Sequence, residues 1–90
     1  MVVPAVSLTL LVKPECHLCE AARDAVTDVL AGLGSAASEV SVEELSILDD
    51  PELNSRYWDE IPVVLIDGRV HTIWRVDPTR LTRALQEAIA

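Results

Sequence analysis

The chain has no phenylalanine, a single lysine and two cysteines among its 90 residues. Its aromatic residues are Tyr57, Trp58 and Trp74, so aliphatic side chains must fill most of the core. A small secreted domain that relies on disulfides normally carries four or more cysteines. A purely structural bridge is therefore the less favoured use of the two thiols.

Basic side chains are also scarce. Seven Lys and Arg stand against fifteen Asp and Glu, which gives a formal net charge of −8. Within 39–60, a stretch rich in acids, Arg56 is the only base. Phosphate backbones are bound by clustered Lys and Arg, so we do not expect nucleic-acid binding. We interpret the acidic stretch as a solvated face, or alternatively as a surface that steers a basic partner.

No apolar run is long enough to cross a membrane. The N-terminal run from Val2 to Val12 meets Lys13-Pro14 too early, and it lacks the basic start of a secretion signal. We therefore expect a cytoplasmic protein that does not bind membranes. The length predicts a single domain over 1–90, and we expect a monomer because no long apolar edge demands a partner.

The first half of the chain predicts a strand, a helix and a second strand. The continuous apolar run 8–12 is typical of a central strand buried on both faces. Alternation over 40–47 predicts a second strand, with either a bulge where Glu43-Glu44 interrupts it or a start later than Val40. Between them, apolar residues at steps of three and four predict a helix that ends at Gly32 or Gly34 and buries Leu18, Ala22, Ala25 and Val29.

The second half predicts a short helix, a hairpin and a last helix. Asp50-Pro51 is an N-cap followed by proline, which starts a helix to about Trp58. The strand 62–68 enters an Asp-Gly turn, and 69–74 is its hairpin partner. A second cap at Asp77-Pro78 begins an amphipathic helix. The order β-α-β-α-β-β-α predicts an α/β fold, with a mixed four-stranded sheet and helices on both faces.

Both cysteines lie in the segment KPECHLC, residues 13–19, where the first strand gives way to the first helix. The unpaired N–H groups and partial positive charge of a helix start favour a thiolate, and Lys13 adds a full charge. In such a setting the pKa of a cysteine falls from ~8.5 to between ~3.5 and ~7.5. We therefore expect Cys16 to attack a substrate disulfide and Cys19, one turn later, to displace the product. A C-x-x-C at a strand-to-helix junction indicates a redox dithiol.

Metal binding is the main alternative use of the thiols. Structural zinc needs four ligands, and the chain offers Cys16, Cys19, His17 and His71 in all. His17 lies between the cysteines, where a chelate with both would be strained, and His71 lies in the distant hairpin. We expect no metal and no cofactor. The alternative function is a non-catalytic binding module that holds a peptide, a metal or an iron–sulfur cluster.

These motifs resemble those of the short bacterial glutaredoxin-like proteins of the thioredoxin superfamily, which carry KPxCHLC early and IPVVLIDG later. The resemblance runs from Leu8 to the last helix. It implies a thiol–disulfide oxidoreductase in which both cysteines are catalytic and Lys13 stabilises the thiolate and binds substrate. It also implies a cis Pro62, which would put the backbone of Ile61 opposite Cys16, where an extended substrate can pair with it.

The chain departs from the family pattern at three places. His17-Leu18 replaces the Pro-Tyr of glutaredoxins, and Leu10 replaces the buried acid of thioredoxins. Thr72-Ile73 replaces a Gly-Gly that grips the γ-glutamyl end of glutathione. The implied partners are therefore disulfide-containing proteins or low-molecular-weight thiols such as glutathione. The sequence does not favour one of these two classes over the other.

Three further residues each have two interpretations. His17 either tunes the thiolate of Cys16, because a cationic neighbour favours the anion, or is an exposed side chain at a helix start. Trp58 and Trp74 either line a substrate groove beside Ile61 or pack against the ends of the sheet. Packing is the commoner fate of a large ring in a small core.

Overall fold

The apolar run predicted as a central strand lies inside the sheet. The computed structural model describes residues 4–90, in which four strands are arranged in the order β2-β1-β3-β4. β1 and β2 are parallel, whereas β3 is antiparallel to both β1 and β4. This confirms the predicted α/β fold with a mixed sheet. The strands are β1 (Val6–Val12), β2 (Val40–Ser46), β3 (Val63–Ile66) and β4 (Arg69–Ile73).

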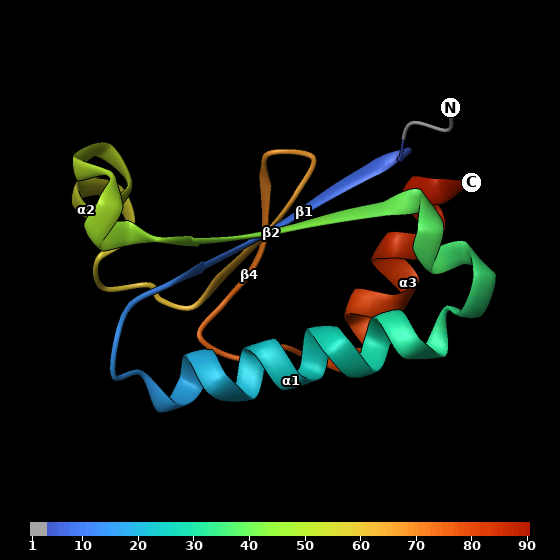
Figure 1. Ribbon diagram of the computed structural model, residues 1–90, viewed down its shortest axis with the longest axis horizontal. Coiled ribbons are helices and arrows are strands. Elements are labelled where there is room, and N and C mark those ends of the chain that lie inside the picture. Colours follow the sequence, from blue (N-terminus) through green and yellow to red (C-terminus); the bar gives the residue numbers. More distant parts are fainter. Residues whose placement is uncertain (1–3) are drawn as a thin grey trace.

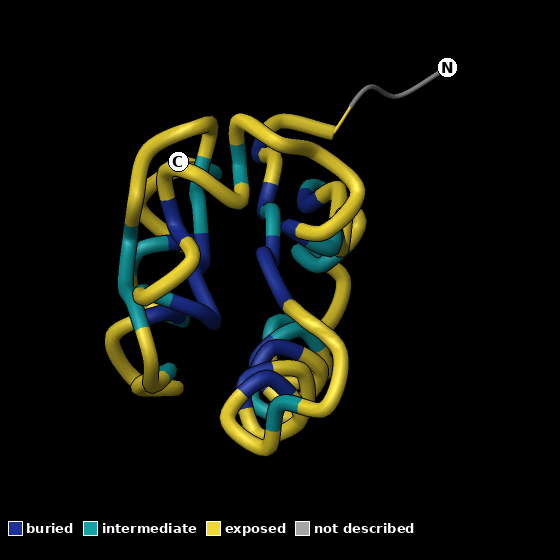
Figure 2. Tube along the Cα trace, turned by 90° about the vertical axis from the view of Figure 1, so that its left-hand side faces the viewer, coloured by how far each residue is buried: buried dark blue, intermediate teal, exposed yellow. Residues whose placement is uncertain are grey.

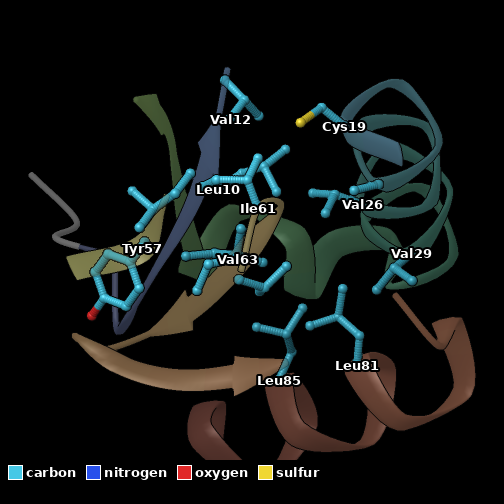
Figure 3. Close-up of a cluster of buried hydrophobic side chains, with 14 of the residues drawn as sticks. Leu10, Val12, Cys19, Val26, Val29, Tyr57, Ile61, Val63, Leu81 and Leu85 are labelled. Carbon is cyan, nitrogen blue, oxygen red and sulfur yellow. The ribbon is translucent and has the colours of Figure 1, made fainter. Parts of the chain in front are cut away.

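Within residues 4–90, three α-helices accompany the sheet (Figure 1). α1 and α3 contact one another, and their buried side chains lie on one side of the strands, whereas Tyr57 of α2 lies on the other (Figure 3). Helices therefore lie on both faces, as predicted. The helices are α1 (His17–Gly32), α2 (Pro51–Tyr57) and α3 (Pro78–Ile89), and two short 3₁₀ segments, η1 (Gly34–Glu39) and η2 (Ile47–Asp49), flank β2.

The core is built from aliphatic side chains, as the lack of phenylalanine requires. Buried stretches of the chain lie along the inner strands and the inward faces of the helices, and exposed stretches lie outside (Figure 2). Tyr57 is the one aromatic side chain of residues 4–90 that is buried. The centre of the core is fully sequestered from solvent and is formed by Leu8, Leu11, Val63, Leu81 and Leu85.

The local start and turn signals form the elements that they predict. Asp50 caps α2 by accepting hydrogen bonds from Glu52 and Leu53 N–H, and Asp77 caps α3 in the same way. Asp67 and Gly68 have φ angles of 51° and 80°. Two successive left-handed residues are what a two-residue hairpin between right-twisted strands requires. Each of these caps and turns involves only a few neighbouring residues, so its sequence pattern predicts the local structure without knowledge of distant contacts.

The predicted bulge at Glu43-Glu44 is wrong. β2 pairs with β1 in unbroken register, and the one register shift among the described strand pairs falls between Val64 and Leu65 of β3. β2 lies at the edge of the sheet, so exposed acids there do not imply a broken strand. The Glu44 carboxylate accepts hydrogen bonds of 2.7 and 3.1 Å from Arg23 of α1 and raises the pKa of that guanidinium.

The buried face of α1 agrees with the predicted one at Ala22 and Val29 but differs from it at Leu18 and Ala25. Cys19, Ala22, Val26 and Val29 are buried, whereas Leu18 is 42% exposed. The spacing rule gave the period of the helix correctly, but it could not show which of two adjacent apolar residues faces the sheet. Leu18 instead faces a surface groove beside the cysteines.

His71 of β4 makes stability depend on pH. Burial, and then the charge of Arg80, lower the pKa of His71 below its usual value of 6.5. The unfolded chain therefore binds a proton more readily, so the contribution of this group to stability is complete above about pH 6.5 and is lost as pH falls through the folded pKa.

We expect His71→Gln to lose less stability than the wild type between pH 7.5 and pH 5. Urea unfolding of both proteins at the two pH values measures this. Asp and Glu are common to both proteins, so their titration cancels in the comparison. An identical acid-induced loss in the two proteins would contradict the assignment to His71.

Candidate active site

The two cysteines form a disulfide at the start of α1. Their Cα atoms are 5.1 Å apart, and Cys16 is the N-cap of the helix. Cys16 has extended backbone angles, and its Sγ accepts a hydrogen bond of 3.1 Å from the Cys19 N–H. The sulfur therefore takes the place of the side-chain oxygen that usually satisfies a first-turn N–H group.

The two sulfur-bearing residues differ in their access to solvent. Cys16 is partly exposed, whereas Cys19 is 2% exposed and belongs to the hydrophobic core. The sulfur of Cys19 points from α1 toward the sheet (Figure 3). A partner molecule can therefore reach Cys16, while Cys19 is reached through Cys16.

A left-handed residue directs the chain into this helix. Glu15, immediately before Cys16, has a φ of 56°. For a residue with a side chain, this conformation costs about 1–2 kcal/mol. The sequence holds no glycine here, so the turn could not be recognised from composition. The turn leads directly into the extended backbone of Cys16 at the N-cap.

The charged residues around the disulfide are exposed. Lys13 lies in the loop between β1 and α1, and it makes no ion pair with any of residues 4–90. The side chain of His17 is fully exposed, and its Nδ1 lies 3.8 Å from Oε2 of Glu20. This placement agrees with the interpretation of His17 as an exposed side chain at a helix start. Among the described residues, no side-chain hydrogen bond or ion pair joins His17 to Cys16.

The loop before β3 has the predicted cis bond between Ile61 and Pro62. The side chain of Ile61 is 6% exposed and packs in the same core as Cys19. Its backbone N–H and C=O make no backbone hydrogen bond within the part of the chain that the structure describes. The Pro62 C=O accepts a hydrogen bond of 2.8 Å from the Trp74 N–H, which joins this loop to the segment after β4.

A groove of about 320 Å³ opens between α1 and the segment that joins β4 to α3. Sequence reasoning allowed for a groove at Trp74, but it did not identify the wall on α1, which lies about 50 residues earlier in the chain. It also favoured packing of both tryptophans against the sheet ends, which is wrong, since Trp58 is 63% and Trp74 52% exposed. Trp74 lines the groove and Trp58 does not; the lining residues are Leu18, Ala21, Ala22, Trp74, Arg75 and Val76.

Neither a metal site nor a membrane span is found in residues 4–90. No three His, Cys, Asp or Glu residues of this range are grouped so that they could hold a metal ion. None of its helices combines the length and the apolar character needed to cross a bilayer.

Fold and site together define a thioredoxin-fold protein with a C-x-x-C disulfide at the start of its first helix. The family model described as Glutaredoxin-like domain (DUF836) matches residues 7–86, so the chain belongs to that family. The resemblance seen in the KPECHLC segment is thereby confirmed at the level of the family.

Relatives and solved structures agree with this assignment. An uncharacterised protein of Mycobacterium tuberculosis is 32% identical over 72 residues, which are 80% of this chain and 74% of the relative. The X-ray structure of a structural-genomics target from X. campestris has a TM-score of 0.69 and 32% identity, covering 89% of this chain and 96% of the other. A mutant thioredoxin of Halobacterium salinarum has a TM-score of 0.68 at 15% identity, covering 96% and 76%, and shows the fold alone.

Proposed function

We propose that the protein is a thiol–disulfide oxidoreductase that exchanges its Cys16/Cys19 dithiol with disulfides of proteins or small thiols. One observation carries the proposal: the sulfur of the partly exposed Cys16 caps a helix and accepts a backbone N–H, with the buried Cys19 one turn behind it. A hydrogen-bond donor and the positive end of a helix both stabilise a thiolate over a thiol.

The exchange proceeds in two displacements. The Cys16 thiolate attacks one sulfur of a substrate disulfide, forming a mixed disulfide and releasing the other substrate sulfur as a thiolate. Cys19, deprotonated, then attacks the Cys16 sulfur, closes the Cys16–Cys19 bond and releases the second thiolate. Two electrons pass from the dithiol to the substrate, and the two protons that the dithiol loses are taken up by the released thiolates.

Burial of Cys19 gives the two displacements their order. Because Cys19 is 2% exposed, an external disulfide meets Cys16 first. In the disulfide-bonded form the two Cα atoms are 5.1 Å apart, within the usual range for a disulfide, so the start of α1 accommodates the bond that the second displacement closes. Low-molecular-weight thiols of a reducing cytoplasm would return the oxidised protein to its dithiol form by the reverse steps.

Substrate positioning falls to the loop before β3. Ile61 offers a backbone N–H and C=O without backbone partners, which suits pairing with an extended peptide. Pro62 shapes this loop, and Lys13 supplies a positive charge in the loop before Cys16. We assign these three residues to substrate binding.

The proposal is tested by the redox behaviour of the wild type. The oxidised protein should contain no titratable thiol and should gain both thiols on mild reduction. The reduced form should then reduce a peptide disulfide repeatedly when a small thiol is supplied. Failure to reduce any disulfide, with both thiols titratable, would refute the proposed function.

Lys13 should accelerate attack on anionic disulfides. We expect Lys13→Gln to lower the rate constant for an anionic aryl disulfide by about threefold to tenfold at low salt, and the difference should shrink at high salt. Stopped-flow measurement at two ionic strengths tests this. Arg83→Gln on α3, which removes the same charge elsewhere, should react like the wild type; equal rates for Lys13→Gln and the wild type would contradict the role.

A further inference from the structure

The groove next to the C-x-x-C segment is lined mostly by apolar side chains. Leu18 stands between the two cysteines in the sequence and lines the groove, and Ala21 and Ala22 continue the same wall along α1. The opposite wall is Trp74 with Val76, and the sixth lining residue is Arg75. Its volume of about 320 Å³ lies at the lower end of the range of ligand pockets, which suits one side chain and not a whole cofactor.

Trp74 is fixed in place although half of it is exposed. Its backbone N–H donates to Pro62 C=O at 2.8 Å, and its indole N–H donates to Asp59 C=O at 3.0 Å. Its φ of 65° is an unfavourable conformation for a residue with a side chain. A residue held by one backbone and one ring hydrogen bond, in an unfavourable backbone conformation and still 52% exposed, is preorganised for contact with another molecule.

The charges around the site disfavour glutathione as the occupant. Two cations, Lys13 before the cysteines and Arg75 in the groove, are outnumbered by acids. Glu15 and Glu20 flank the cysteines, and Asp59-Glu60 precedes the Ile61 loop, within a chain of net charge −8. Glutathione is an anion at neutral pH and has no apolar side chain. A neutral or basic peptide with an apolar residue beside its cysteine complements both the groove and these charges.

We infer that the groove is a specificity pocket, which selects protein disulfides carrying an aliphatic or aromatic side chain next to the reacting cysteine. The inference rests on the proposed function and names the substrate class for the same site. While the peptide backbone pairs with the Ile61 loop, the apolar side chain packs between Leu18 and Trp74. The attack by Cys16 and the release of the leaving thiolate follow the steps given above.

The experiment uses the reduced protein and three mixed disulfides with the same chromogenic leaving thiol. Two are hexapeptides that differ only in having Leu or Gly after the cysteine, and the third is glutathione. We expect a kcat/KM about tenfold higher for the Leu peptide than for the Gly peptide or glutathione, since burying one apolar side chain typically discriminates by 10-fold or more.

Two variants attribute the preference to the groove. Trp74→Ala removes one wall, and Ala21→Glu, at an exposed helical position, places a charge in the groove without disturbing the core. Both should lower the ratio of kcat/KM for the Leu peptide to that for the Gly peptide from about ten to about one. Trp58→Ala, which removes an exposed ring outside the groove, should match the wild type on all three substrates.

The outcomes separate the inference from the function on which it rests. Equal kcat/KM for the Leu and Gly peptides, a preference for glutathione, or a uniform loss on all substrates in both groove variants would overturn the pocket while leaving the oxidoreductase intact. If none of the three disulfides reacts with the reduced wild type, the proposed function fails, and the pocket fails with it.

Discussion

Replacing Cys16 with serine should reduce disulfide exchange by about three orders of magnitude or more. A serine hydroxyl at this position is not ionised near neutral pH and cannot attack a disulfide sulfur, so the first displacement stops. Turnover of a peptide disulfide by the reduced protein, followed by release of a chromogenic thiol, measures the loss. The effect is large because Cys19, at 2% exposure, cannot take over the attack.

Cys19→Ser is the matched variant of the same chemistry. It keeps the attacking Cys16, so the first leaving thiolate should be released at nearly the wild-type rate, and the reaction should then halt as a mixed disulfide at Cys16. Mass spectrometry of the intact protein detects the added substrate thiol. Thermal unfolding of both variants in reductant, compared with the reduced wild type, controls for misfolding. Wild-type activity of Cys16→Ser, or a Cys19→Ser protein that never traps substrate, would contradict the assigned roles.

Leu8→Ala should destabilise the protein by about 3–5 kcal/mol. Leu8 is 0% exposed at the centre of β1, and β1 has neighbours on both sides, so the cavity left behind has little freedom to close. A small domain is stable by only about 5–15 kcal/mol, and the substitution should therefore remove a large share of the total. The lack of phenylalanine makes each buried leucine a large fraction of this core.

Urea unfolding of Leu8→Ala beside Leu48→Ala measures this effect. Leu48 is 64% exposed, so the same truncation there should change the free energy of unfolding by less than about 0.5 kcal/mol. A loss below about 1 kcal/mol at Leu8 would show that the core tolerates truncation at its centre, contrary to the dense packing expected of protein interiors.

The elements that could be predicted from the sequence are those specified by neighbouring residues. An aspartate followed by proline starts a helix because the cap and the fixed φ act within one turn, and both Asp50 and Asp77 do so. The Asp67-Gly68 turn is also specified locally, because two adjacent residues with positive φ suffice to close the hairpin. The cysteine pair could be placed at the helix start because its position depends on one strand and one helix that are adjacent in the chain.

The features that could not be predicted depend on contacts between distant residues. Nothing near Glu44 in the sequence shows that Arg23 lies opposite it, so an intact edge strand looked interrupted. The exposure of Leu18 and Trp74 follows from the way α1 and the segment after β4 leave a gap between them. The spacing of apolar residues at three and four positions predicts which residues of one helix share a face. It cannot predict a groove, because a groove lies between two segments that are distant in the chain.

The position of β2 at the border of the sheet has a consequence for self-association. A strand with an unpaired side is a template on which another molecule can add a strand of its own. Ser41, Glu43 and Glu44 are exposed along this strand. Pairing of two copies through β2 would bring like charges together and would dehydrate carboxylates, so the same acids that obscured the strand in the sequence hinder the growth of aggregates from it.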